Sequence, residues 1–320
     1  MTQPTFSLPK KSDVRRSFSN AAATYDDAAF LQREVCDRLF ERLQYIKLNP
    51  VNALDMGAGT GYSTEKLRTA YPQAQTIALD CALGMLEFAQ QKLVPASAPE
   101  TLASKLFSRF KSNGNARSAA RTTFVCGDAE NLPLAAESVD LIVSSLTLQW
   151  CDPLAVAREA YRVLKPNGCF MFTTFGPDTL KELRTAFKAV DNKPHVNQFL
   201  DMHDVGDQLL TAGFADPVMD QEIITLTYSK LKPLLKELKA IGAHNMMPGR
   251  SAGMLGKASW NALQSAYEAF RRHDTDGKLP ASYEVVYGQA WKPEISKQKS
   301  TDGVQAIPLP EFKRMLKREG

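Results

Sequence analysis

Leu54-Asp55-Met56-Gly57-Ala58-Gly59-Thr60-Gly61 is the stretch that decides the fold of this 320-residue chain. It follows the apolar run 51–54 and precedes a helix-like segment, 63–70. Glycines between a strand and a helix let the backbone approach a ligand closely, and the start of the helix offers unpaired N–H groups. This layout is typical of a loop that holds a nucleotide, either a dinucleotide or the nucleoside of S-adenosylmethionine (SAM).

The spacing of the glycines and the acid in front of them favour SAM. A dinucleotide loop has the spacing G-x-G-x-x-G, whereas this loop reads G-x-G-x-G. Asp55 would repel a pyrophosphate, but it can anchor the amino group of the methionine part of SAM. A glycine turn with a purely structural role is the simpler alternative. We therefore expect Asp55, Gly57, Ala58, Gly59 and Gly61 at the cofactor.

Two further acids follow predicted strands. Asp80 closes the strand 75–79, at the place where an acid hydrogen-bonds ribose hydroxyls in open α/β sheets. It also suits the N-cap of a helix over 83–92. Asp128 follows the strand 123–126 and can accept a hydrogen bond from an adenine amino group, although a turn or capping role explains it nearly as well.

The rest of the chain alternates strands with helices, which implies a parallel sheet with right-handed crossovers. Between a helix over 154–164 and its strand lies the turn Lys165-Pro166-Asn167-Gly168, where Gly168 fits a helix C-terminus or a tight turn. The remaining strands are predicted over 139–145, 169–174, 221–228 and 283–291, and the remaining helices over 178–190, 203–212, 231–241 and 258–272.

These motifs resemble the class I methyltransferases and, more specifically, the malonyl-acyl-carrier-protein O-methyltransferases of biotin synthesis. The resemblance implies a Rossmann-like α/β fold. Its sheet would have seven mostly parallel strands, with helices on both faces, an antiparallel last strand and a helical cap inserted between the last two strands. The similarity runs from about Ser17 to Trp291, and its specific part lies in Phe18-Ser19-Asn20-Ala21-Ala22-Ala23-Thr24-Tyr25 and in the segments 148–151, 173–175, 194–200, 238–244, 249–250 and 283–288.

The resemblance also implies the reaction: SAM methylates the free carboxyl group of malonyl-acyl carrier protein, which leaves S-adenosylhomocysteine and starts the pimelate chain of biotin. A carboxyl group ordinarily has a pKa of about 4 and is already ionised near neutral pH, so no general base is expected. It needs a clamp, for which we expect His244 and Arg250, since arginine binds carboxylates through two hydrogen bonds. A helix cap and a surface guanidinium are equally good roles for these two residues. His195 and Arg184 are weaker candidates.

Other residues are expected around the two ligands. Gln149, Trp150, Phe175 and His195 are expected along the substrate channel. The further cofactor contacts expected are Tyr25, Cys81, Met85, Ala129, Ser145 and Leu146.

We divide the chain into an N-terminal helical lid, 1–48; a SAM-binding core, 49–228; a helical cap, 229–275; a final strand, 276–291; and a basic extension, 292–320. The core includes an insert, 95–121, with five basic residues against one acid. The insert and the extension depart from the family. Basic clusters are usually solvated surface, but this insert, together with the cap, is a candidate dock for an acidic carrier protein.

Composition is consistent with a soluble cytoplasmic monomer. The apolar fraction is 44%, the net charge is +4, and the five cysteines show no paired or metal-binding spacing. We expect no metal, no nucleic acid and no membrane contact. Two alternatives stay open: a methyltransferase for another small acid or a quinone, and an assembly factor that binds SAM without transferring a methyl group. A carbon or phenol acceptor would need His195 or His244 as a base.

Overall fold

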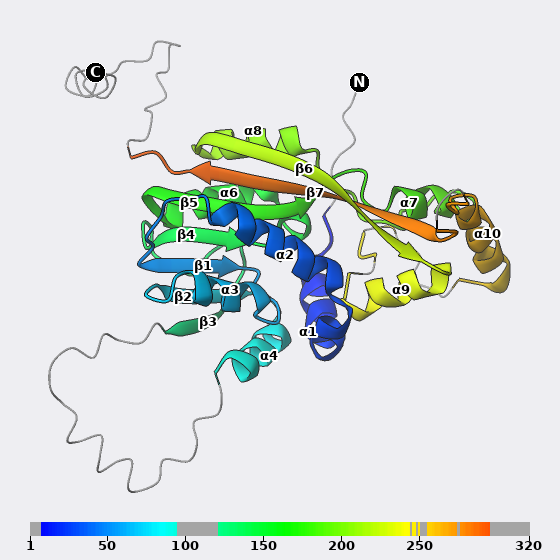
Figure 1. Ribbon diagram of the computed structural model, residues 1–320, viewed down its shortest axis with the longest axis horizontal. Helices are drawn as coiled ribbons and strands as arrows, with labels where there is room; N and C mark the ends of the chain where they lie inside the picture. Colours follow the sequence, from blue (N-terminus) through cyan, green and yellow to red (C-terminus); the bar gives the residue numbers. More distant parts are fainter. Residues whose placement is uncertain are drawn as a thin grey trace, which may run out of the picture.

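A twisted seven-stranded sheet runs through the protein (Figure 1) in the order β3-β2-β1-β4-β5-β7-β6. The computed structural model describes residues 8–94, 121–243, 245–247, 249, 255–273 and 276–294. β7 runs antiparallel between β5 and β6, and the other strands run parallel, which confirms the predicted fold class. The strands are β1 (Asn52–Met56), β2 (Gln75–Asp80), β3 (Thr122–Cys126), β4 (Val139–Ser144), β5 (Leu164–Phe175), β6 (Ala215–Tyr228) and β7 (Leu279–Trp291).

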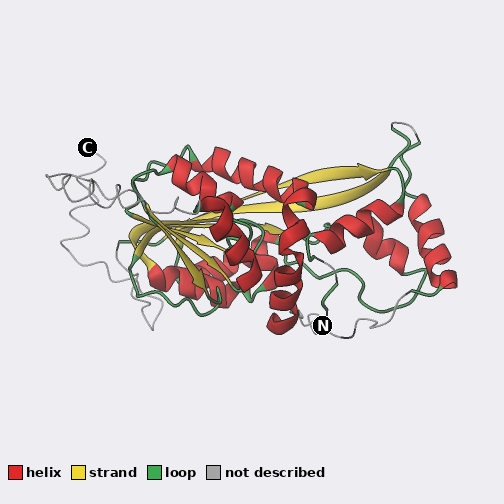
Figure 2. Cartoon of the chain, turned by 90° about the horizontal axis from the view of Figure 1, so that it is seen from below, coloured by secondary structure: helices red, strands yellow, loops and turns green. Residues whose placement is uncertain are grey.

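Helices cover both faces of the sheet (Figure 2), so the central strands are apolar on both sides. In β1, Ala53 faces one core with α2, α7, α9 and α10, whereas Leu54 and Met56 face a second core with α6 and α8. The helices are α1 (Lys11–Ala28), α2 (Phe30–Leu43), α3 (Tyr62–Ala70), α4 (Leu83–Leu93), the 3₁₀ turn η1 (Leu148–Trp150), α6 (Pro153–Val163), α7 (Lys181–Phe187), α8 (Met202–Ala212), α9 (Leu231–Ala240) and α10 (Lys257–Glu268).

Two local predictions were wrong. The turn predicted over 165–168 lies inside β5, where four residues bulge opposite Asp140 of β4, and its left-handed residue is Asn167 (φ 64°) rather than Gly168. The helix predicted over 178–190 is only α7, because Leu180 adopts φ 53° and donates its N–H to Ser282 O of β7 (2.6 Å), which delays the start of the helix.

The lid helix α1 connects the core to the cap. The long β6–β7 ribbon extends past the parallel strands, and α9 and α10 lie near its far end (Figure 1). α1 packs against α4 of the core and against α9 of the cap. The hydroxyls of Ser17 and Thr24 donate hydrogen bonds to Gly242 O and Ala240 O (2.9 Å each). The insert residues 95–120 and the extension residues 295–320 lie outside the described residues.

Candidate functional site

The glycine loop joins β1 to α3 and is pinned beside β2. Gly57, Gly59 and Gly61 all have positive φ angles (86°, 53° and 86°). Gly57 N–H donates to Leu79 O of β2 (2.7 Å), and a Cβ at Gly57 would lie 1.9 Å from Thr147 Oγ1. A Cβ at Gly59 would meet no heavy atom within 4 Å. The loop is therefore tightly packed at Gly57 and open at Gly59.

A pocket of about 750 Å³, here called the loop pocket, lies between this loop, the ends of β2 to β4 and the lid helix α1. Most of the residues predicted to bind the cofactor line it: Tyr25, Gly57, Gly59, Asp80, Cys81, Met85, Asp128, Ala129, Ser145 and Leu146. The sequence did not indicate several others, among them Lys11, Arg15, Phe18 and Thr147.

Asp80 faces the loop pocket with an ordered carboxylate. Its Oδ2 accepts the N–H of Gly59 (2.9 Å), and its Oδ1 accepts the N–H of Ala82, the N-cap of α4 (2.8 Å). Burial raises the pKa of Asp80, although these amides counteract it. Each oxygen keeps a further lone pair that can accept a hydrogen bond, so the group suits the two hydroxyls of a ribose.

Asp128 joins the lid to the core. Its Oδ2 pairs with Lys11 (2.5 Å) and Arg15 (3.5 Å) of α1, and its Oδ1 accepts Glu130 N–H (3.0 Å). Burial alone would raise the pKa of Asp128, but the hydrogen bonds and the two cations lower it overall. The lid therefore closes the loop pocket through ion pairs at the place where the sequence predicts the adenine.

Two predicted cofactor residues lie outside the lining of the pockets. Asp55 is fully buried; its Oδ2 accepts the Thr64 hydroxyl (2.6 Å), while its Oδ1 accepts no hydrogen bond from any described residue. Burial raises the pKa of Asp55 to about 6. Gly61 packs against α4, where a Cβ would lie 2.8 Å from Leu93 Cδ1. A contact of either residue with the cofactor stays a prediction.

A second hollow of about 430 Å³, the helix pocket, lies between the glycine loop and the junction of α1 and α2. Ala58 lines it, and so do Asp26, Gln32 and Arg33. Asp26 accepts the Thr60 hydroxyl (2.5 Å) and pairs with a lysine of α4. The Arg33 guanidinium donates to Asp26 O, but it pairs with no carboxylate among the described residues. It is a partly buried cation that faces a pocket.

A third hollow of about 780 Å³, the cap pocket, lies between the core and α9 and has a mostly apolar lining. Trp150, Phe175 and His195, three of the residues predicted for the substrate channel, line it; their contact with a substrate stays a prediction. The His195 ring stacks on Phe187 (4.0 Å between centroids), and its Nε2 lies 2.7 Å from Asp191 Oδ1.

Other predicted substrate residues do not reach the cap pocket or fall outside the described chain. Gln149 is buried behind the wall, and its Nε2 donates to Leu146 O (2.7 Å). Arg184 donates to the backbone oxygens of residues 177 and 179. His244 and Arg250 lie outside the described residues, but Ala243 and Asn245, the chain neighbours of His244, line the cap pocket.

The three pockets share walls. Tyr25 lines the loop and helix pockets, Trp150 lines the loop and cap pockets, and Gln32 lines the helix and cap pockets. Phe18 of the lid packs edge-on against Trp150 at this junction (5.2 Å between centroids). A ligand that fills the loop and helix pockets would therefore turn its middle toward the cap pocket.

Known proteins share both the motif and most of the chain. Residues 54–172 match the family of methyltransferase domains. A malonyl-[acyl-carrier protein] O-methyltransferase of Gallionella capsiferriformans is 52% identical over 90% of this chain and 92% of its own length. The protein of the same name from Laribacter hongkongensis is 50% identical over 91% of this chain and 93% of its own. The chain belongs to the malonyl-[acyl-carrier protein] O-methyltransferase family. It is accordingly a SAM-dependent O-methyltransferase.

A solved structure supports the fold. The YcgJ protein of Bacillus subtilis is 16% identical, covers 80% of this chain and 98% of its own, and has a TM-score of 0.52. Among the described residues, no cluster of histidine, cysteine or acidic side chains suits a metal ion, and no helix is long and apolar enough to cross a membrane.

Sequence reasoning missed the charged residues that the lid contributes. Lys11, Arg15 and Arg33 lie on helices whose basic residues look like ordinary solvated surface. The only signal in the chain was the 18–25 motif, which predicts a lid but not which of its neighbours face inward.

Proposed function

We propose that this enzyme transfers the methyl group of SAM to the free carboxylate of a malonyl group held on an acyl carrier protein, giving a methyl ester for biotin synthesis. One observation carries the proposal: the cap pocket meets the loop pocket at Trp150 and the helix pocket at Gln32, and the loop and helix pockets meet each other at Tyr25. A donor and an acceptor held in separate pockets can meet there. The malonyl carrier as acceptor is taken from the names of the relatives.

The residues around the glycine loop fit SAM in two parts. The loop pocket suits adenosine, with Asp80 at the ribose hydroxyls and the open side of Gly59 leaving room for the ligand. The helix pocket suits the zwitterionic methionine end, because Arg33 has no carboxylate partner among the described residues and can take the ligand carboxylate. The unpaired Oδ1 of Asp55, below the loop, is the group predicted for the ammonium.

Methyl transfer to a carboxylate depends on the alignment of the acceptor oxygen with the methyl donor. SAM, when bound, would supply an electrophilic methyl group. The acceptor carboxylate would attack it opposite the sulfur, so that the O–C bond forms as the C–S bond breaks and S-adenosylhomocysteine leaves, and no proton has to move. Trp150 and Phe175 would hold the malonyl group and exclude water from the path of attack. The clamp for the acceptor must be moderate, because the charges of donor and acceptor cancel in the transition state and a strong clamp would favour the ground state. His244 and Arg250 remain our candidates for it.

The direct test incubates the purified enzyme with labelled SAM and either malonyl-carrier protein or malonyl-N-acetylcysteamine, a small thioester. We expect a base-labile methyl ester and stoichiometric S-adenosylhomocysteine. Label that is stable to base would assign a ring or nitrogen acceptor instead. SAM binding without any transfer to either substrate would favour an assembly factor.

The clamp is tested with Arg250→Ala. We expect a higher KM for the malonyl substrate and an unchanged dissociation constant for SAM. Unchanged kinetics would remove Arg250 from the clamp.

A further inference from the structure

A row of lysines lies on α9, a helix that lines part of the cap pocket. Lys232, Lys236 and Lys239 are four and three residues apart, a spacing that puts them on one face of a helix. All three side chains are exposed. None of them forms an ion pair with an acid among the described residues, whereas Arg38 and Arg42 of α2 pair with Glu222 and Asp220.

The three lysines surround an apolar hollow. Together with Leu235 and Trp260 they line a depression of about 690 Å³ on the surface of the cap. Lys239 also lines the cap pocket, so the depression and the acceptor site share a wall.

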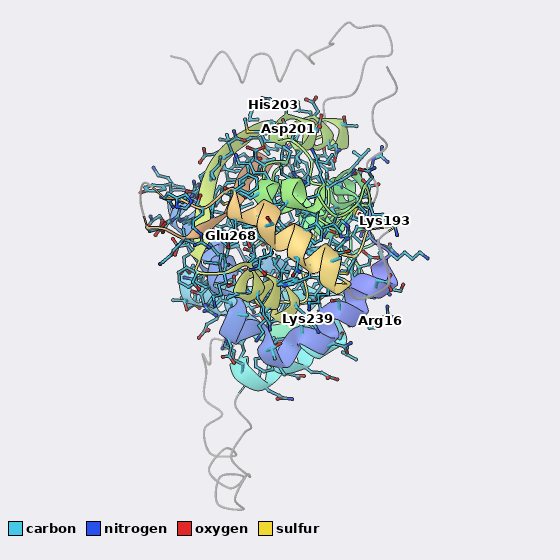
Figure 3. The ribbon with its side chains drawn as sticks, turned by 90° about the vertical axis from the view of Figure 1, so that its right-hand side faces the viewer. Arg16, Lys193, Asp201, His203, Lys239 and Glu268 are labelled. Carbon is cyan, nitrogen blue, oxygen red and sulfur yellow. The ribbon has the colours of Figure 1, made fainter. Side chains whose placement is uncertain are left out.

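The positive charge continues onto the lid. Lys236 and Lys239 line a second groove, between α9 and α1, together with Arg16. Arg16 and Lys239 lie near each other in the view of Figure 3. The acid Asp13 pairs with Arg16 in this groove (2.7 Å) and leaves the two lysines unneutralised.

We propose that the lysine face, defined as Lys232, Lys236 and Lys239 around Leu235 and Trp260, is the surface on which the acyl carrier protein docks. The inference rests on the proposed function and names where its partner binds. The matching partner surface is an acidic helix with an apolar side chain that fills the hollow, since unpaired surface cations steer an acidic partner. A carrier bound there would place its prosthetic arm at the shared wall near Lys239, from which the thioester enters the cap pocket.

The lysine face adjoins the cap pocket, whereas the described residues at the two ends of the basic insert do not line it. Val94, just before the insert, follows α4, and Arg121, its last residue, precedes β3, which is the edge strand farthest from β6. The cap pocket is instead lined in part by α9, through Leu235, Leu238 and Lys239. An anionic membrane would also attract lysines, but the apolar groups here lie in a hollow rather than on a protruding surface.

The test compares two substrates across matched variants. Lys232→Glu/Lys236→Glu reverses two charges of the face and leaves Lys239 intact. Lys188→Glu/Lys193→Glu makes the same change in net charge at two exposed lysines outside the face. The insert is tested with Lys105→Glu/Arg109→Glu/Lys111→Glu. For each variant, kcat/KM is measured with malonyl-carrier protein and with malonyl-N-acetylcysteamine at low and high salt.

We expect the Lys232/Lys236 variant to lose about tenfold or more in kcat/KM for the carrier substrate, through KM, and to keep its activity on the small thioester. The loss should shrink at high salt, because salt screens exposed charges over about 10 Å. The Lys188/Lys193 control should behave like the wild type.

Several results would overturn the inference without touching the proposed function. Equal losses on both substrates would place the defect in the pocket. Loss of carrier use in the insert variant alone would move docking to the insert. Binding of the wild type to anionic vesicles that carrier protein does not displace would assign the face to a lipid, and a shift of a dimer to monomers in the Lys232/Lys236 variant would assign it to a second copy. Absence of methyl ester with both substrates in the wild type would refute the proposed function itself.

Discussion

Replacing Asp55 by asparagine should change how the stability of the protein depends on pH. The carboxylate is fully buried, has one oxygen without a described partner, and has its pKa raised by burial from 3.8 to about 6. At about 1.4 kcal/mol for each pKa unit, ionising Asp55 costs the folded state about 3 kcal/mol.

The direction of this pH dependence follows from which state, folded or unfolded, binds the Asp55 proton more tightly. Between about pH 4 and pH 6 the folded state holds the Asp55 proton more tightly than the unfolded chain, so the wild type loses stability as the pH rises through that window. Asparagine does not titrate there. Relative to Asp55→Asn, the free energy of unfolding of the wild type should therefore fall by about 2 kcal/mol from pH 4 to pH 7.

Urea unfolding of both proteins without cofactor, at several pH values from 4 to 7, measures this difference. The other titrating groups are shared by both proteins and cancel in the comparison. Parallel stability curves would refute the reasoning. If the ligand ammonium meets Oδ1, SAM binding near pH 5.5 should also release a proton, which calorimetry in buffers of different ionisation enthalpy detects in the wild type and not in the variant.

Three further predictions concern the pockets. Arg33→Met should weaken S-adenosylhomocysteine binding by tenfold or more and leave binding of methylthioadenosine, which lacks the amino-acid end, unchanged; equal losses in calorimetry would refute the helix pocket as the methionine site. Gly59→Ala should keep the fold, at a cost of about 1–2 kcal/mol for its left-handed backbone, but lose SAM affinity. Gly57→Ala should instead lower the melting temperature more strongly, because its Cβ would clash with the Thr147 side chain, and comparable melting temperatures would contradict this. Lys11→Met should speed cofactor release in stopped-flow measurements through loss of its pair with Asp128, with a change in stability below about 1 kcal/mol; an unchanged rate would refute the role of the pair.

The sequence predicted the sheet well because its signals are local. Parallel strands buried on both faces are short apolar runs, and the glycine loop marks one strand end without ambiguity. Predictions failed where a distant contact decides the backbone. Leu180 is left-handed because β7 accepts its N–H, and no residue near it in the sequence signals that contact.

In the candidate site too, residues placed by local sequence signals were predicted, whereas residues placed by distant packing were not. Asp80 ends β2 and Ser145 follows β4, so their positions at the pocket could be predicted from the topology. The positions of Arg33 and of the lysine face depend on how the lid and the cap pack. The sequence of an amphipathic helix does not indicate which pocket its basic residues face. Gln149 has the polarity of a substrate ligand, but its amide is occupied by the backbone oxygen of Leu146.

The lid helix α1 borders both the proposed cofactor site and the surface proposed for the carrier protein. It closes the loop pocket through Lys11 and Arg15, hydrogen-bonds the end of α9 through Ser17 and Thr24, and borders the lysine face at Arg16. Displacing this one helix would therefore disturb the binding of both substrates at once. We expect an ordered kinetic scheme in which SAM binds before the carrier and S-adenosylhomocysteine leaves after it, with the opening of α1, rather than the transfer of the methyl group, setting the turnover rate.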